Sequence, residues 1–515
     1  MKILLAAAAL GAGLGGPALA QPLSMSQWQE CDGFSEATKK TDGITLDNYS
    51  FVGLTTQAPP PLRQNPPASP DAIAACDAVL ARPELAEAYW QRRANLLKSR
   101  AIHRLSAGDA AGALADLDRA EAAVRSPDDP YYQRGLKLGI ELARAYAYLL
   151  AGDKPAARAL AQKAGDQRPY LRSPTLASAL IMARASDRKD VDDALHARGR
   201  LDPSDIDLLF LTEMQDGRFA DAIALYPQLS PPKTFDSQRW PFQIVEQDLK
   251  NRAVGEVYWA ARTGMYAIAM DGLGRTAEAR AAMDGGRARL ASAAATTPPF
   301  MANGYPVKSK YLPELAALLN QEMAIQGGTA LDKAEAAFGK VAKTSTSPRP
   351  FDRPEEELRV ILNQLPDSDV AGLIPAYKPA KGTFWGPAED DVEGYRERTD
   401  SKSGLTTVRM RLRLGSAAVG EEMALLRAAE LAAAAGRDGI VIIERRDFHH
   451  TFATTYNNIP GAAVPTGYST ELDVAFVDRS NLPEPYRQAA WRVLDANDVR
   501  RTLTPLYPPP VPKTR

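Results

Sequence analysis

The sequence is poor in the side chains that bind metals or act as nucleophiles. Its 515 residues include only two cysteines and four histidines. It contains no H-E-x-x-H, G-x-S-x-G or P-loop pattern. His449 and His450 are adjacent on a predicted strand, so their side chains point to opposite faces and do not converge on one ion. The sequence therefore predicts no catalytic residues, no cofactor and no metal site.

Neither sign of charge is in excess, and long apolar runs are scarce. The chain has 62 Lys and Arg against 63 Asp and Glu, a balance that gives no reason to expect a nucleic-acid partner. After the first twenty residues, no apolar run reaches the roughly 18 residues that span a bilayer. We therefore expect no transmembrane segment in the mature chain.

The first twenty residues have the pattern of a secretory signal peptide. Lys2 supplies a positive start, residues 3–14 are apolar, and Ala18-Leu19-Ala20 is a small-x-small cleavage site. The alternative is a membrane anchor, although the apolar segment is shorter than a span. Cleavage after Ala20 predicts export to the periplasm or cell envelope. No cysteine follows the cleavage site, so lipidation is not expected.

The only two cysteines, Cys31 and Cys76, are candidates for a disulfide. Export brings the chain into an oxidising compartment, where such a bond persists. It would tie the N-terminal segment to the first predicted helix, Pro70–Leu80, and contribute about 3–4 kcal/mol. The alternative is two unpaired thiols, with Cys76 packed in that helix.

Residues 141–170 predict two helices joined at Gly152–Asp153. The second carries a stripe of small and apolar residues with helical spacing, and Pro169 ends it because proline cannot continue a helix. Related patterns centre on Gly108, Gly217 and Gly274. A lone helical hairpin cannot bury its apolar face, so the hairpins are expected to stack.

This hairpin resembles a tetratricopeptide (TPR) unit. The residues at the family's signature positions are Ala145, Tyr148, Gly152, Ala157, Ala161, Ala164 and Pro169. The resemblance covers about residues 70–342 and implies an α-solenoid that binds a protein or peptide in its concave groove. The alternative is an irregular helical bundle. Most of the aromatic residues on these helices are expected in the core between hairpins, and a few could line the groove; they are Tyr89, Trp90, Tyr131, Tyr132, Tyr146 and Tyr148. Polar contacts in the groove could come from Arg92, Arg93, Lys98 and Arg144, although solvated helix faces explain these charges equally well.

The pattern changes after residue 390. Residues 406–414 alternate strictly between apolar residues and arginines, which predicts a half-buried strand. A helix over 417–435, a strand over 440–452 and a strand over 472–476 follow. This order predicts a small α+β (β-α-β-β) domain. Its helix segment Leu425–Ala432 resembles that of small uncharacterised bacterial envelope lipoprotein domains, a family that supplies no catalytic residues to transfer.

The predicted strand presents a stripe of three arginines, Arg409, Arg411 and Arg413. Guanidinium groups spaced along one strand face could bind an anionic glycan or a lipid headgroup. The alternative is pairing across the sheet with Glu471 and Asp473.

We therefore expect a mostly α-helical, exported, non-enzymatic scaffold that mediates protein–protein interaction in the cell envelope. The rival is an envelope protein that binds an anionic ligand through its C-terminal α+β domain. The predicted parts are a signal peptide (1–20), an extension with a Pro-rich linker (21–68), a TPR-like array (69–343), a helix and linker (344–389), an α+β domain (390–478) and a terminal helix with a Pro-rich tail (479–515).

Overall fold

A computed structural model gives the fold. It describes residues 26–38, 42–43, 48–51, 54–57, 70–129, 132–185, 188–229, 259, 262–295, 300–302, 305–307, 362, 376–380, 392–413, 417–452, 455–456, 459–460 and 464–507. The predicted signal peptide, the Pro-rich linker, most of 344–389 and the tail after Tyr507 lie outside these residues. Tyr131 and Leu414 lie outside them as well. None of the described helices has the length and apolar character needed to cross a membrane.

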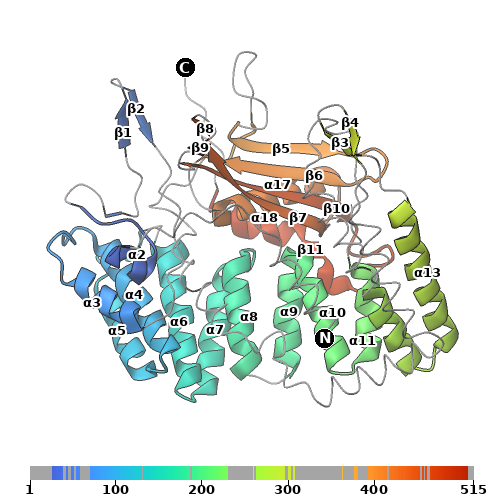
Figure 1. The fold of residues 1–515 in the computed structure, drawn as a ribbon, viewed down its shortest axis with the longest axis horizontal. Coiled ribbons are helices and arrows are strands. Elements are labelled where there is room, and N and C mark those ends of the chain that lie inside the picture. The colour runs from blue at the N-terminus through green and yellow to red at the C-terminus, as the bar shows by residue number, and fades with distance from the viewer. Residues whose placement is uncertain are drawn as a thin grey trace. The chain divides into compact units, whose positions relative to one another are not determined.

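The chain divides into two compact units, and the boundary cuts through the predicted array. The first half of the array, up to Pro203, forms one unit together with residues 351–515. The second half belongs to another unit, Ser204–Pro350. The two units are described separately below. The described residues are mostly helical and include one five-stranded sheet (Figure 1).

The unit that contains the C-terminus begins with a short capped helix. Helix α2 (Gln27–Asp32) starts at Ser26, whose side chain and that of Gln29 form a capping box. It packs on α3 (Pro70–Leu80), which the sequence predicted at the same residues. Strands β1 (Asn48–Phe51) and β2 (Leu54–Gln57) pair as an antiparallel hairpin.

Six further helices follow in the same unit. They are α4 (Trp90–Ser106), α5 (Ala110–Ala122), α6 (Lys137–Leu150), α7 (Lys154–Gln167), α8 (Arg172–Ala185) and α9 (Arg188–Leu201). A π-helical turn, η1 (Tyr132–Leu136), leads into α6. Each helix from α4 to α9 packs on the next along the chain, and α6 also contacts α4 and α8. The segment after Pro83, which the sequence predicted as helical, forms successive turns up to Tyr89.

The hairpin turns share one hydrogen-bonding pattern. At Gly108 and Gly152 φ is +79° and +85°, and the following N–H bonds the carbonyl five residues back. This is the Schellman arrangement, which favours glycine because other residues are strained at positive φ. Asp109 and Asp153 then cap α5 and α7 with their side chains.

The C-terminal part of this unit is an α+β domain with five strands. They are β5 (Gly394–Thr399), β6 (Thr406–Leu412), β7 (Gly439–Phe452), β10 (Val464–Val477) and β11 (Leu494–Asp495), in the antiparallel order β11-β7-β10-β6-β5. Helix α17 (Ala417–Ala434) covers one face of β6, β7 and β10. The core between them includes Val408, Met410, Leu412 and Leu426, as the alternation in β6 predicts.

Three elements of this domain differ from the prediction. Strand β10 begins at Val464, eight residues before the predicted strand, and its register shifts between Pro465 and Gly467. Strands β5 and β11 were not predicted. The sequence predicted a terminal helix over Pro485–Val499. In the structure a 3-10 turn, η5 (Ala490–Arg492), and β11 occupy the middle of this segment, and helix α18 covers Ala496–Leu503.

The unit Ser204–Pro350 contains α10 (Ser204–Gln215), α11 (Phe219–Leu225), a 3-10 turn η2 (Tyr226–Gln228) and α13 (Thr276–Ala295). Residues 262–272 are also helical. Gly217 and Gly274 repeat the turn pattern of Gly108 and Gly152, with φ of +70° and +78°. Strands β3 (Phe300–Ala302) and β4 (Tyr305–Val307) form a hairpin. Two further strands, β8 (Thr455–Tyr456) and β9 (Ile459–Pro460), pair between β7 and β10 in the other unit.

Candidate functional site

The residues of the repeat signature meet in the core of the α6–α7 hairpin. Ala145 on α6 and the three signature alanines on α7, Ala157, Ala161 and Ala164, have no exposed surface. Tyr148 packs against the same core. A methyl side chain at each of these positions lets the two backbones approach closely. Pro169 is exposed and lies two residues beyond the end of α7, as its helix-ending role predicts.

Several of the aromatic residues on the helices pack in the core, where most of them were expected. Trp90, Tyr132 and Tyr146 are buried in the helical core. Lys98 is completely buried and donates a hydrogen bond of 2.9 Å to the carbonyl of Leu362, which belongs to the same core. Most residues of α4, α6 and α8 are buried. Trp90, Tyr132, Tyr146 and Lys98 are therefore core residues and do not line a binding surface.

Other polar residues proposed for the groove form ion pairs and hydrogen bonds that hold the helices together. Arg144 pairs with Asp118 and Glu121 of α5 at 2.6 and 2.9 Å. Arg93 donates to the carbonyl of Leu85. Tyr89 is half-buried beside the N-terminal core.

A buried ion pair joins the N-terminal segment to α4, and a disulfide joins it to α3. Arg92 and Asp32, both completely buried, approach to 2.9 Å, and the Arg92 guanidinium lies over the ring of Trp28. Cys31 and Cys76 form a disulfide with a Cα separation of 4.8 Å, which joins α2 to α3. The carbonyl of Cys31 also lies 2.8 Å from Nε2 of His103. These contacts give the segment a structural role.

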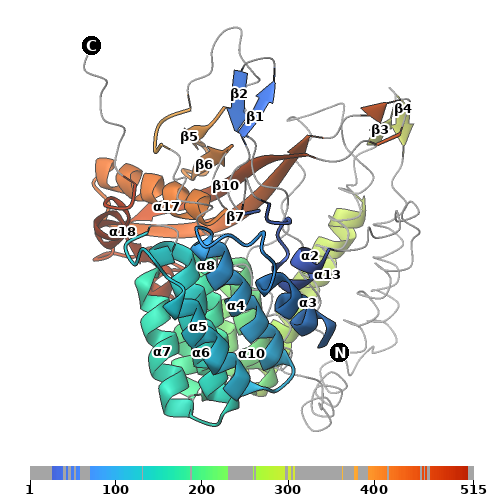
Figure 2. The ribbon, with the colours of Figure 1, turned by 90° about the vertical axis from the view of Figure 1, so that its left-hand side faces the viewer.

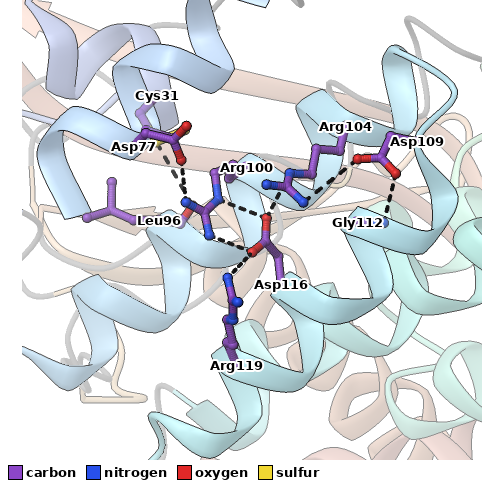
Figure 3. Close-up of polar contacts among 10 residues, drawn as sticks. Cys31, Asp77, Leu96, Arg100, Arg104, Asp109, Gly112, Asp116 and Arg119 are labelled. Carbon is purple, nitrogen blue, oxygen red and sulfur yellow. Dashed lines mark hydrogen bonds and ion pairs between the residues drawn. A yellow bond between two sulfur atoms is a disulfide. The ribbon is translucent and has the colours of Figure 1, made fainter. Parts of the chain in front are cut away.

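A second buried carboxylate, Asp116, organises three arginines between α3, α4 and α5 (Figure 3). Arg100 binds it through two nitrogens, at 2.8 and 2.5 Å, and also reaches Asp77 of α3. Arg104 and Arg119 approach Asp116 at 3.2 and 3.5 Å. Burial lowers the pKa of Arg100, but its bonds to Asp116 and Asp77 outweigh this effect and raise the pKa overall. Arg100 therefore stays charged, and its ion pairs join the three helices.

The helices and the C-terminal domain meet at a third buried cluster. Arg168, just after α7, donates two hydrogen bonds to Glu422 of α17, at 3.0 and 2.5 Å. Arg134 of η1 donates to the Tyr507 hydroxyl, which in turn donates to Glu422, each at 2.5 Å. Glu422 is only 1% exposed. These four residues, the junction cluster, connect segments far apart in the sequence.

The electrostatics of the junction cluster favour the glutamate anion. Burial alone would raise the pKa of Glu422, but the charge and hydrogen bonds of Arg168, the bond from Tyr507 and the charge of Arg134 lower it overall. The apolar contacts extend the junction, because Tyr170 and Leu201 belong to the same core as α17 and the sheet. The sheet domain lies beside the ends of α7 and α8 in both views (Figures 1 and 2).

Few features of the sequence could have predicted this junction. Arg168 and Glu422 are 254 residues apart, and each lies in a helical pattern that explains it as a surface charge. The one signal was Tyr507, an aromatic residue within the predicted Pro-rich tail. The structure buries it almost completely, at 1% exposure.

The three arginines of the predicted stripe do not form one surface. Arg409 pairs with Glu471 on the neighbouring strand at 3.5 Å. Arg411, expected to point outward, is only 4% exposed; its neighbours across the sheet, Gly394 and Ser469, are small and leave room for its long side chain. Arg413 is exposed and lies just beyond the end of β6.

The histidines have separate surroundings. His450 contacts the Ser469 hydroxyl at 2.7 Å, and His196 stacks on Trp491 with ring centroids 4.3 Å apart. Within the described ranges, no three His, Cys, Asp or Glu side chains are grouped as metal ligands would be.

A polar cavity of about 330 Å³ lies beside the junction. Residues near the ends of α7 and α9 form one wall, and residues of β11 and α18 form the other. Its charged lining consists of Arg200, Arg479, Arg501, Asp495 and Asp498. This is the candidate binding site in the unit.

Comparison of the chain with protein-family models, with curated proteins and with solved structures finds no match.

Proposed function

We propose that the protein is an exported, non-enzymatic scaffold of TPR-like repeats that binds a protein partner in the cell envelope. The observation that carries this proposal is the recurrence of one hairpin turn at Gly108, Gly152, Gly217 and Gly274. Helices that pack in sequence order, from α4 to α9, add to it. Both features are typical of helical-repeat proteins, whose common role is to present an extended surface to other proteins.

The use of buried charge supports a scaffold over an enzyme. Asp32, Asp116 and Glu422 are each buried and each hydrogen-bonded to arginine. In these three clusters the charged groups join helices to one another or to the C-terminal domain. Ionisable groups that act in catalysis must instead face a substrate.

In this proposal the partner contacts the helices of the array that carry the most exposed residues. Helices α5 and α7 carry most of the exposed residues of the array in this unit, whereas α4, α6 and α8 are largely buried. On α7, Lys154 and Arg158 are exposed and lie one turn apart. We place the partner contact on this outer face.

The test uses the full mature chain. It is immobilised, the retained envelope protein is identified and purified, and its affinity is measured by calorimetry. Replacing Lys154 and Arg158 by Glu should weaken binding at least ten-fold while the variant stays folded. The matched control reverses two exposed charges on the C-terminal domain, Arg398→Glu with Arg437→Glu. Loss of binding in the control alone would refute the scaffold surface.

The rival role, binding of an anionic glycan or lipid headgroup by the arginine stripe, has less support. That role requires several guanidinium groups on one accessible face. Arg411 is buried and Arg409 is paired with Glu471. Only Arg413, beyond the end of the strand, is exposed.

A further inference from the structure

The cavity between α9 and α18 has one charged group that the fold does not neutralise. Its volume of about 330 Å³ is at the small end of the range for ligand sites. Tyr170 and Leu201 line it from the repeat side and Leu494 from β11. The lining therefore combines apolar side chains with charged ones.

Both carboxylates of the cavity already have partners. Asp495 pairs with Arg479, and Asp498 pairs with Arg501 and accepts a hydrogen bond from the Tyr170 hydroxyl. The Asp495 side chain also caps α18, because it accepts from the N–H groups of Asn497 and Asp498 at 2.9 and 3.1 Å. The start of this helix is therefore occupied by the chain's own carboxylate.

Arg200 has no comparable partner. Its guanidinium makes no hydrogen bond or ion pair with any residue in the described part of the chain, and its Nε is sealed from solvent without a hydrogen bond. Burial lowers its pKa, and the only charge effect in the other direction comes from Tyr170. A partly desolvated cation without a counter-ion is costly. A bound anion would remove this cost.

We propose that this cavity binds a carboxylate group, with Arg200 as its principal ligand. Three arginines and two aspartates give the lining a net charge of +1, which a monoanion neutralises. A dianion such as phosphate would leave excess negative charge near Asp495 and Asp498. The planar guanidinium matches a carboxylate with two parallel hydrogen bonds. The carboxylate can belong to a small organic acid or to the C-terminus of a peptide.

The experiment measures binding to the full mature chain by calorimetry, with chemical shifts of a ¹³C-carboxylate probe as a second readout. The probe is N-acetyl-alanine, and its neutral counterpart is N-acetyl-alaninamide. We expect the acid to bind and the amide to bind at least ten-fold more weakly. Equal binding of both, no binding of the acid, or tighter binding of inorganic phosphate would overturn the proposal.

Variants assign the binding to Arg200. Arg200→Gln should weaken binding of N-acetyl-alanine at least ten-fold, whereas Arg398→Gln, the same charge change at an exposed site outside the cavity, should leave it unchanged. Arg200→Lys keeps the charge but loses the paired hydrogen bonds, so an intermediate affinity is expected. Arg200→Gln should not lower the melting temperature, because no ion pair is lost. Unchanged binding in both Arg200 variants would refute the site.

A longer probe identifies the source of the carboxylate. Acetyl-tetra-alanine with a free C-terminus should match or exceed the affinity of N-acetyl-alanine if the natural ligand is a peptide end. Selective binding of the shorter acid supports a small organic acid instead. The cavity is separate from the outer face of α7, so loss of partner binding by the repeats would leave carboxylate binding intact.

Discussion

Glu422 is the residue on which the junction between the helices and the C-terminal domain depends most directly. It is the single carboxylate of the junction cluster and faces Arg168 and Arg134. Glu422→Gln would remove the buried carboxylate that both guanidinium groups face. Removing one partner of a buried ion pair typically costs about 3–5 kcal/mol. We expect a loss of this size in urea unfolding, while Glu484→Gln, in the exposed pair with Arg487, should change stability by less than about 1 kcal/mol.

The same residue predicts how stability depends on pH. The folded protein lowers the pKa of Glu422 below its ordinary value, so the ionised form stabilises the fold. This contribution is fully present above the ordinary glutamate pKa of about 4.3 and is lost as pH falls through the lower, folded value. The stability difference between the wild type and Glu422→Gln should therefore be constant above about pH 5 and shrink in more acidic urea titrations. A difference that grows on acidification would contradict this assignment.

At the scale of the element, two Gly→Ala substitutions, one in a hairpin turn and one within a helix, should have opposite effects on stability. A methyl group added at Gly152 or at Gly285 would meet no atom within 4 Å. Gly152 has φ +85°, so Gly152→Ala should destabilise the α6–α7 hairpin by about 1 kcal/mol. Gly285 lies within α13 without positive φ, so Gly285→Ala should stabilise it by about 1 kcal/mol. Hydrogen exchange of α7 and α13 amides measures each effect locally.

The crossing of α6 and α7 gives a second prediction at this scale. Ala157 is completely buried in the helical core. Ala157→Leu would insert three carbon atoms where the helices touch and should cost about 1–3 kcal/mol. Ala159→Leu, on the exposed face of the same helix, is the matched control. Equal melting temperatures for the two variants would argue against a close crossing at Ala157.

The sequence predicted an element well where its local residue pattern was regular along the whole segment. Helix α3, the Gly152 turn and the alternation of β6 follow from such signals. The start of β10 did not, because Pro465 and Gly467 interrupt the pattern where the register shifts. Strand β11 has two residues, too few for any period. The burial of Arg411 could not be predicted either, since it depends on small neighbours from two other strands.

At the scale of the molecule, the candidate binding site depends on contacts between distant parts of the chain. The cavity takes Arg200 from a repeat helix and Asp498 from the C-terminal helix. The shared core that includes Tyr170, Leu201 and Tyr507 holds these walls together. Periodicity reports which face of one helix is buried but not which distant segment covers it. The domain boundary predicted at residue 390 therefore separates two parts that the structure places in one compact unit.

This shared core leads to a prediction about truncation. A chain that ends at residue 389 loses Glu422 and Tyr507, so Arg134 and Arg168 lose their buried partners and Tyr170 and Leu201 lose their apolar cover. We expect amides of α6 to α9 to exchange faster by at least ten-fold, and limited proteolysis to cut near residues 168–172. Removal of residues 508–515 alone, which keeps Tyr507, is the control and should leave exchange unchanged. Equal protection in the truncated and full chains would show that the repeats fold independently of the C-terminal domain, and the junction cluster would then serve only to orient it.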